Sequence, residues 1–196
     1  PQFGDFNSEA KRNEIFNNFD HVWWYGCMFP FAPSPNYHLD TWAYYGRATS
    51  WLQYYYNIEG EYYWTISMYG KYNETLKIFD YSQENWESDP LTVGDCAGDG
   101  RLTYPGVRYG INGPITTIRM EQIRSSKQDY EYLYMLEKGL GTYNKKCGTN
   151  YQSVQQLLSP YFGLMFDGTT IKKSFTTADM KNCHDGVISY LNRLYN

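Results

Sequence analysis

Closely spaced carboxylates are the residues of this chain that could carry out acid–base chemistry. Two carboxyl groups held near one substrate can divide the work, because one accepts a proton while the other donates one. The close pairs are Glu59 with Glu61, Asp95 with Asp99, and Asp129 with Glu131. The last pair falls on a predicted long helix. There we expect salt bridges to Arg124, Lys127 or Lys138 on neighbouring turns rather than catalysis.

Nucleophilic and metal chemistry is not indicated. The histidines His21, His38 and His184 have no serine or cysteine partner that the sequence can place, so a nucleophilic triad is not predicted. The four cysteines lack the close paired spacing of a zinc site. No glycine-rich loop with the lysine of a phosphate-binding motif precedes a helix. We therefore expect neither a metal nor a cofactor.

Aromatic residues are abundant in this chain. Its 196 residues include 22 Tyr, 10 Phe and 6 Trp, which together make up 19% of the sequence. Because Tyr and Trp combine a flat apolar face with a polar tip, a surplus of them suits surfaces that stack against sugar rings. An AT-rich genome, which raises the content of Tyr, Asn and Lys, explains the same surplus equally well.

The charge pattern argues against nucleic acid and membrane partners. The net charge is −4, and the basic doublets Lys145-Lys146 and Lys172-Lys173 are too short to follow a phosphate backbone. The uncharged segment 22–38 is interrupted by prolines, so it does not predict a membrane span. Because the chain begins at Pro1 without an initiator Met or an apolar signal region, we expect a processed product or a piece of a longer protein.

The first half of the chain predicts a βαβ unit. Residues 22–27 form an apolar run typical of a strand that is covered on both faces. A helix is expected from Asp40 or Thr41 to about residue 57, and a second strand over 61–66. The two strands should therefore be parallel neighbours. A shorter helix, capped by Ser8, is expected before them over residues 8–19.

The second half predicts loops followed by helices. Residues 67–113 are mostly irregular, and a loop of this length in an ordered domain is usually functional. A helix over 114–138 should be stopped by Gly139 and Gly141. Two helices are expected in the tail, at 154–164 with an interruption at Pro160, and at 177–195.

An ordered series of short motifs runs through residues 20–138. It comprises Val22-Trp23-Trp24-Tyr25, Arg47, Trp51, Gly60-Glu61-Tyr62-Tyr63-Trp64, Gly98-Asp99-Gly100, Tyr104-Pro105-Gly106, Arg119-x-Glu121 and Asp129-Tyr130-Glu131-Tyr132. None of these pieces is specific alone, but their order resembles the C-terminal part of the catalytic domain of glycoside hydrolase family 123 and its uncharacterised relatives.

The resemblance implies an α/β fold that is the C-terminal portion of a (β/α)8, or TIM-type, barrel. Residues 1–144 would supply the last two strands with their helices and a long strand-end loop, and residues 145–196 would be a helical extension. A pair of parallel strands leaves unpaired edges. The N-terminal remainder of the barrel is therefore an expected partner, on the same precursor or on another chain.

In such a barrel the active site lies at the C-terminal ends of the strands. We therefore expect aromatic side chains there to bind the sugar, assisted by a carboxylate and an arginine. The predicted substrate-binding residues are Trp24, Tyr25, Trp64, Tyr69, Tyr104, Asp99 and Arg47. Trp23 and Tyr63, on the alternate pleat, are expected in the core. Asp99 in a glycine-flanked turn more often bonds its own backbone, and Arg47 and Arg119 would each hold a carboxylate in a fork-like pair.

The resemblance also implies the chemistry. The family is of the substrate-assisted type, in which the N-acetyl group of the substrate is the nucleophile and an adjacent Asp-Glu pair assists it. This chain contains no Asp-Glu dipeptide, so the catalytic pair is expected outside it. The implied function is that of an N-acetylhexosaminidase-type glycoside hydrolase acting on glycans. The alternative is a catalytically inactive glycan-binding or structural extracellular glycoprotein.

The cysteines and one sequon favour a secreted protein. Four cysteines allow two disulfides, and Cys147 with Cys183 is the predicted pair because it would close the helical tail and stabilise it by ~3–4 kcal/mol. Cys27 with Cys96 is the second expected pair, although Cys27 could equally be a buried thiol. The sequon Asn73-Glu74-Thr75 makes Asn73 a candidate glycosylation site.

Overall fold

The computed structural model describes residues 1–80, 92–93 and 96–196. Asp95, a candidate carboxylate, therefore lies outside the described residues. The chain begins with a short 3-10 helix, η1 (Phe3–Asn7), and with α1 (Glu9–Asn18). The Ser8 hydroxyl accepts a hydrogen bond from the amide of Lys11, so the predicted cap of this helix is confirmed. Helix α1 itself buries none of its residues.

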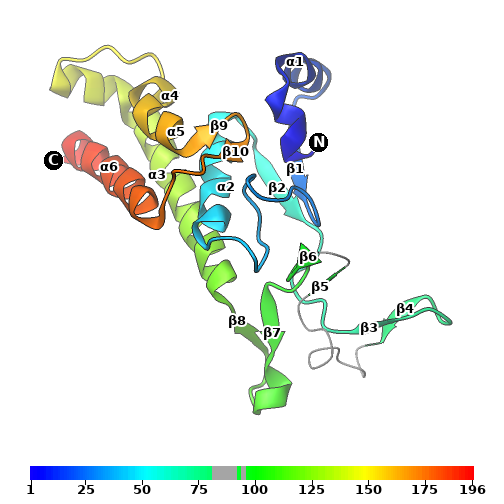
Figure 1. The fold of residues 1–196 in the computed structure, drawn as a ribbon. Coiled ribbons are helices and arrows are strands. Elements are labelled where there is room, and N and C mark those ends of the chain that lie inside the picture. The colour runs from blue at the N-terminus through cyan, green and yellow to red at the C-terminus, as the bar shows by residue number, and fades with distance from the viewer. Residues whose placement is uncertain (81–91, 94–95) are drawn as a thin grey trace.

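The predicted βαβ unit is present. Strands β1 (Trp23–Gly26) and β2 (Gly60–Tyr63) are parallel, with Trp23 opposite Gly60 and Tyr25 opposite Tyr62. Helix α2 (Tyr44–Tyr55) connects them, and it begins a few residues later than predicted and without a side-chain cap. In Figure 1, α2 lies beside the strand pair, between it and the other long helices.

The described residues form no closed barrel, so the predicted portion of a TIM-type barrel is not confirmed beyond its βαβ unit. Among these residues β1 and β2 pair with no third strand. The other strands form four short antiparallel pairs. They are β3 (Lys71–Asn73) with β4 (Ile78–Asp80), β5 (Thr92–Val93) with β6 (Cys96–Ala97), β7 (Thr103–Pro105) with β8 (Pro114–Thr116), and β9 (Phe166–Asp167) with β10 (Thr170–Ile171). A second 3-10 helix, η2 (Gly106–Tyr109), follows β7.

The long helix differs from its prediction at both ends. Helix α3 spans Ile118–Cys147, because residues 114–116 pair with β7 instead of starting the helix. Thr117 caps the helix, and Gly148 ends it in a left-handed conformation with φ 66°. Gly139 was predicted to stop the helix, but it lies inside α3 because its missing side chain leaves space for Leu194 of α6. Packing against α6 therefore overrides the low helix propensity of glycine.

A buried carboxylate joins three helices. Asp129 of α3 accepts two hydrogen bonds from the guanidinium of Arg47, from Nε at 2.7 Å and from Nη2 at 2.8 Å. The indole of Trp51 in α2 donates to Oδ2 at 3.0 Å, and Nδ1 of His184 lies 2.7 Å from Oδ1. Residue His184 belongs to α6 (Thr177–Tyr195). The expected pairing of Asp129 with Arg124, Lys127 or Lys138 is thus wrong, because its partners come from the two neighbouring helices.

The tail forms the helices predicted for it. Pro160 separates α4 (Val154–Leu157) from α5 (Ser159–Met165), where it occupies the first turn. One hydrophobic core includes Trp24 of β1, Leu52 of α2, Leu133 of α3 and Val187 of α6. Helix α3 and this core both continue across residue 144, at which we divided the chain. No helix among the described residues is long and apolar enough to cross a membrane.

Neither predicted disulfide is present. All four cysteines lie within the described residues, and each is a thiol. The contacts of Asp129 with His184 and of Gly139 with Leu194 make α3 and α6 run in the same direction. Cys183 therefore lies level with Asp129, roughly 27 Å along the helix axis from Cys147 at 1.5 Å per residue. A disulfide requires Cα atoms within about 7 Å.

The second cysteine pair is absent as well. Cys96 is buried, and its Sγ donates a hydrogen bond to the carbonyl of Met28 at 3.4 Å. Burial raises the pKa of the Cys183 thiol to about 12, so this thiol is unreactive at neutral pH. The cysteines therefore give no support to the expectation that the protein is secreted.

The glycines of α3 give a matched test of its packing. Gly139→Ala places a methyl group against Leu194, whereas Gly141→Ala meets nothing within 4 Å. We expect Gly141→Ala to raise the free energy of unfolding by roughly 0.5–1 kcal/mol, as alanine does inside a helix. Gly139→Ala should lower it by about 1–3 kcal/mol through overpacking. Urea denaturation of both variants measures the difference, and equal stabilisation by both would contradict the contact between α3 and α6.

Candidate active site

The loop after β6 is fixed to the end of β2 by Asp99. This side chain is fully buried, and both its oxygens accept hydrogen bonds. The Tyr63 hydroxyl donates to Oδ1 at 2.6 Å and the Trp64 indole donates to Oδ2 at 3.0 Å. The amide of Gly100 donates to the Tyr63 oxygen at 3.1 Å. Asp99 therefore orients Trp64, and it does so through side chains rather than through its own backbone.

The glycines beside Asp99 are explained by their neighbours. Gly98 has φ 76° and Gly100 has φ 70°, in the left-handed region that favours glycine. A Cβ at Gly100 would lie 2.6 Å from the Trp64 indole, and one at Gly98 would collide with the guanidinium of Arg119. The Gly-Asp-Gly motif thus lets a tryptophan and an arginine approach the backbone from opposite flanks of Asp99.

Arg119 holds the same loop from the start of α3. Its Nη1 donates to the carbonyls of Tyr37 at 2.9 Å and of Gly98 at 2.7 Å, and its Nη2 donates to the carbonyl of Arg101. Burial lowers the pKa of this guanidinium, which is nevertheless always charged at physiological pH. Arg119 was expected to form a fork-like pair with a carboxylate. It binds backbone carbonyls instead, so its role is to position the loop.

A second carboxylate lies on the helix-covered face of β2. Glu61 accepts a hydrogen bond from the Tyr37 hydroxyl at 2.6 Å, and Lys127 of α3 lies 3.0 Å from its other oxygen. Burial, and then the charge of Glu61, raise the pKa of Tyr37 well above its ordinary value. Gln53 accepts a further hydrogen bond from Lys127 at 3.1 Å. The sequence did not predict this network, because no local pattern links Tyr37 to a strand 24 residues later.

The two faces of the β1–β2 pair differ strongly. Trp24 is 1% exposed and packs edge-on against Phe6 with ring centroids 6.0 Å apart. Trp23 and Tyr62 are each 57% exposed on the opposite face, where Tyr25 stacks on Tyr62 at 5.7 Å. We call Trp23, Tyr25 and Tyr62 the open aromatic face.

The roles expected of the two tryptophans in β1 are therefore exchanged. Trp24 is in the core, where no sugar can reach it, and Trp23 is on the surface. The reason is that α2 covers the face of the sheet that carries Trp24, and the alternation along the strand then exposes Trp23. Nothing in the doublet of tryptophans itself indicates which face the helix covers.

The remaining candidates are only partly brought together. Trp64 and Tyr69, in the loop after β2, and Tyr104, in β7, are half-buried, and Tyr69 shares a hydrogen bond with the hydroxyl of Thr103. Arg47 does not lie at the strand ends, because its guanidinium is bound to Asp129 in the helix layer. The expected fork-like pair of Arg47 with a carboxylate is present, and it joins α2 to α3 away from the strand ends.

The space enclosed at the strand ends is small. A cavity lined by Gly26, Cys27, Tyr37, Glu61 and Tyr63, among others, has a volume of about 10 Å³. That is room for about one water molecule. This cavity is therefore too small to hold a sugar ring. Among the described residues, no group of three or more His, Cys, Asp or Glu side chains could hold a metal ion.

Comparison with known families decides the relationship. The family described as "Glycoside hydrolase 123, catalytic domain" matches residues 4–136, which is more than half of the chain. The chain belongs to the glycoside hydrolase 123 family. A glycoside hydrolase-like function follows from this membership. No curated protein matches the sequence. The family match ends inside α3, so α4, α5 and α6 lie beyond it.

Within the family 123 domain, the buried phenol of Tyr63 gives a pH-dependent test of its bond to Asp99. Burial, and then the hydrogen bond to Asp99, raise the pKa of Tyr63 above its ordinary value of 10. Below pH 10 this phenol is protonated in both states, so its contribution to stability is fully present. Above pH 10 the unfolded chain loses the proton first, and the free energy of unfolding falls by about 1.4 kcal/mol per pH unit for each such tyrosine.

We therefore expect Tyr63→Phe to be less stable at pH 8 by about 1–3 kcal/mol, because Asp99 loses a donor. Its stability should then decline less steeply above pH 10 than that of the parent protein, by about 1.4 kcal/mol per unit. Urea denaturation between pH 8 and pH 11.5 measures both effects. Parallel declines in the two proteins would contradict the assignment.

Proposed function

We propose that this chain is the C-terminal part of a glycoside hydrolase barrel that cleaves glycans containing N-acetylhexosamine by the substrate-assisted route. The family match over residues 4–136 is the observation that carries this proposal. The parallel βαβ unit supports it, since this is the repeating unit of a β/α barrel. The catalytic Asp-Glu pair is proposed to lie outside these residues, because the chain has no such dipeptide.

The carboxylates near the strand ends support placing the catalytic pair elsewhere. A general acid must offer a proton to the leaving oxygen, and a carboxylate that orients the N-acetyl group must reach that group. Both oxygens of Asp99 already accept hydrogen bonds from aromatic side chains, and both oxygens of Glu61 are bound by Tyr37 and Lys127. These carboxylates are positioning groups, and neither is placed to act on a sugar.

The role proposed for this chain is to bind the substrate. Trp64 presents a flat indole at the end of β2, and Asp99 and Gly100 fix its orientation. An aromatic ring held in this way stacks on a pyranose without losing side-chain freedom on binding. Tyr69, in the loop after β2, and Tyr104, in β7, complete the proposed sugar-binding surface, together with Tyr25 near the C-terminal end of β1.

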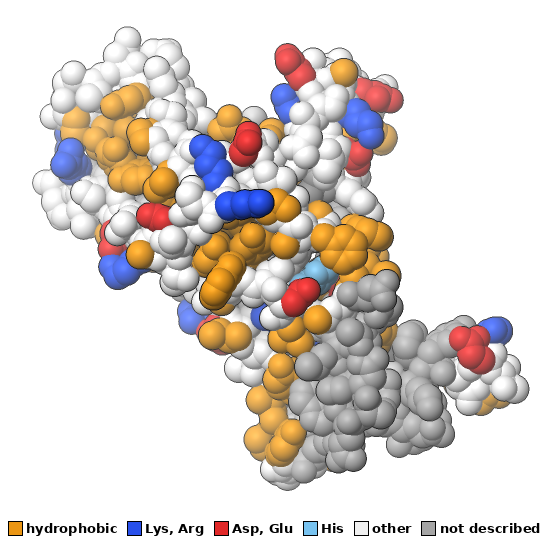
Figure 2. Space-filling model, in the orientation of Figure 1, with side chains coloured by type: hydrophobic (Ala, Val, Ile, Leu, Met, Phe, Trp, Pro, Cys, Tyr) orange, Lys and Arg blue, Asp and Glu red, His pale blue; other side chains and the backbone are white. Residues whose placement is uncertain are grey.

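The open aromatic face supports the proposal that a partner covers the sheet. Parallel sheets are normally covered on both faces, and among the described residues helices lie over only one face of the β1–β2 pair. The β7–β8 hairpin and η2, at the lower end of Figure 2, also carry exposed apolar side chains, among them Val107, Tyr109 and Ile111. We propose that the remaining strands of the barrel, on the same precursor or on another chain, cover Trp23 and Tyr62 and pair with the edges of β1 and β2.

The alternative is a catalytically inactive glycan-binding or structural extracellular glycoprotein. The missing Asp-Glu pair favours it. For either function, the sequon at Asn73 is the observation that supports an extracellular location. Asn73 is the last residue of β3, and its Oδ1 accepts hydrogen bonds from the amides of Thr75 and Leu76 in the turn before β4. A hairpin turn of this kind suits an N-linked glycan.

Turnover of aryl glycosides tests the proposed function. With 4-nitrophenyl N-acetyl-β-glucosaminide and N-acetyl-β-galactosaminide as substrates, Trp64→Ala in the protein expressed from its complete gene should lower kcat/KM ten-fold or more. Ten-fold corresponds to about 1.4 kcal/mol, the least expected for losing a stacked ring. Tyr195→Ala is the matched control, since Tyr195 is an exposed aromatic residue at the far end of α6 and its loss should leave turnover unchanged.

Two further outcomes separate the alternatives. Inhibition by a thiazoline analogue of the cyclic intermediate indicates the substrate-assisted route. Glycan binding without any hydrolysis of either substrate favours the inactive glycoprotein. If Trp64→Ala and Tyr195→Ala are equally active and equally stable to heat, the sugar-binding surface is not at Trp64.

A further inference from the structure

We infer that a cavity between α2 and the tail is a second binding site for a neutral saccharide, remote from the strand ends. The choice of a saccharide rests on the proposed function, because the protein would already meet glycans. The cavity has a volume of about 410 Å³, within the range of small-molecule sites in proteins. It is lined by Tyr55, Tyr56, Gln155, Gln156, Ser159, Phe162, Gly163, Phe166 and Gly168.

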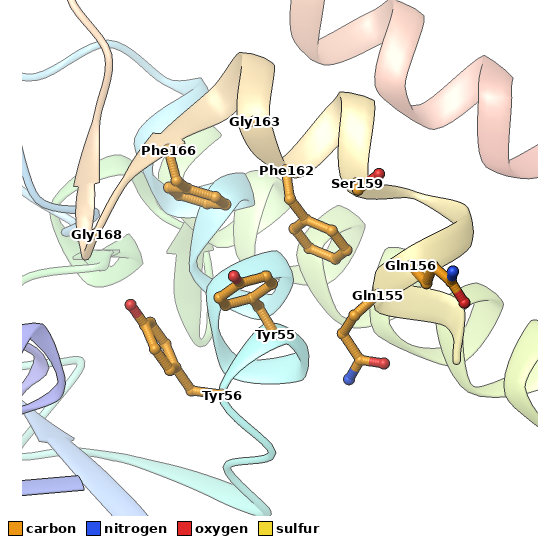
Figure 3. Close-up of a pocket in the computed structure, with 9 residues that line it drawn as sticks. All are labelled: Tyr55, Tyr56, Gln155, Gln156, Ser159, Phe162, Gly163, Phe166 and Gly168. Atoms are coloured by element: carbon orange, nitrogen blue, oxygen red, sulfur yellow. The ribbon is translucent and has the colours of Figure 1, made fainter. Parts of the chain in front are cut away.

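The cavity has the walls that a sugar ring requires. Figure 3 shows the rings of Tyr55 and Tyr56 on one side and those of Phe162 and Phe166 on the other, with the amide of Gln155 at one end. Tyr55 is 43% exposed, and its ring lies 5.0 Å from that of Phe162 and 5.1 Å from that of Tyr56. These separations are packing contacts between the rings, so a pyranose would lie against their exposed faces and not between Tyr55 and Phe162.

The polar groups of the cavity are all uncharged. They are the phenols of Tyr55 and Tyr56, the side-chain amides of Gln155 and Gln156, and the hydroxyl of Ser159. None of the nine lining residues carries a charge. Amides and hydroxyls both donate and accept hydrogen bonds, as the hydroxyl and N-acetyl groups of a sugar require. A cationic ligand would find no counter-ion among the lining residues, and the cations nearest to them, Arg12 at Tyr56 and Lys172 at Gly163, would repel it, so a neutral saccharide fits better than a cationic one.

Two glycines line the cavity, and they differ in what a side chain there would meet. A Cβ built at Gly163 of α5 would meet nothing within 4 Å, so this position borders open space. Gly168, with φ 59°, lies in the turn between β9 and β10, and a Cβ there would lie 2.5 Å from the Asn7 side chain, so this glycine makes room for Asn7. Substitution of Gly163 by a long side chain should therefore fill the space without disturbing the aromatic rings.

The cavity is distinct from the strand-end site. Tyr55 and Tyr56 lie at the C-terminal end of α2, just before β2 begins, whereas Trp64 follows the other end of β2. The residues from Gln155 to Gly168 lie beyond the family match, which ends at residue 136. The tail would thus add a saccharide-anchoring site to the family 123 domain, holding one part of a long glycan while another part reaches the strand ends.

Calorimetric titration of the complete protein tests this inference. The probe is the β-1,4-linked tetramer of N-acetylglucosamine, used in the Trp64→Ala background so that binding at the strand ends is already weakened. Tyr55→Ala and Gly163→Met should each weaken binding at least ten-fold, the first by removing a wall and the second by filling the space. Gly141→Met is the matched control, because Gly141 also borders open space inside a helix but lies in α3.

The de-N-acetylated, cationic tetramer should bind at least ten-fold more weakly than the neutral one. Unchanged affinity in both Tyr55→Ala and Gly163→Met, or no binding of the tetramer to any of these proteins, would overturn the inference. Binding that depends on Tyr55 in a protein that hydrolyses nothing would leave the second site standing while the proposed activity fails. In an active protein, Tyr55→Ala with Trp64 intact should leave turnover of the 4-nitrophenyl glycosides unchanged.

Discussion

The buried carboxylate of Asp129 determines how the helices of this protein sit together. It is 1% exposed and lies within hydrogen-bond distance of a guanidinium, an indole and an imidazole from two neighbouring helices. A carboxylate in such a place is costly unless its oxygens are fully satisfied. The bidentate bond from Arg47 satisfies both of them and sets the orientation of α2 against α3. The contact of His184 with the same carboxylate holds α6 against α3, so the tail packs together with the other long helices.

The position of this layer explains the two faces of the strand pair. Because α2 and α3 lie over one face, Trp24 is buried there and Glu61 is bound by Lys127 of α3. The alternation along each strand then exposes Trp23 and Tyr62 on the other face. The Gly98–Gly100 turn is attached to the same arrangement by Arg119, which binds the Gly98 carbonyl, and by Trp64, which binds Asp99. The exposed aromatic rings, the bound Glu61 and the fixed Gly98–Gly100 turn thus all follow from where the helices pack.

The sequence predicted what depends on local pattern and missed what depends on packing. The parallel βαβ unit, the cap at Ser8 and the break at Pro160 were all predictable, because each follows from residues adjacent in the chain. The continuation of α3 through Gly139 was not, since it depends on Leu194, 55 positions away in sequence. The same applies to the site. The Gly-Asp-Gly turn and the fork-like pairing of Arg47 follow from sequence motifs, but the partners of Asp99 and the choice of Asp129 as the carboxylate that Arg47 binds come from contacts between distant elements.

The central claim is that further strands of a family 123 barrel cover the open aromatic face in the complete protein. Hydroxyl-radical footprinting with mass spectrometry tests it directly, and the chain supplies matched controls. Trp23 and Tyr62 are each 57% exposed here, compared with 70% for Trp42 and 61% for Tyr195 on surfaces that need no cover. In the protein expressed from its complete gene, the account predicts that Trp42 and Tyr195 are oxidised rapidly while Trp23 and Tyr62 are protected at least several-fold. Oxidation of Trp23 as fast as Trp42, and of Tyr62 as fast as Tyr195, would contradict it.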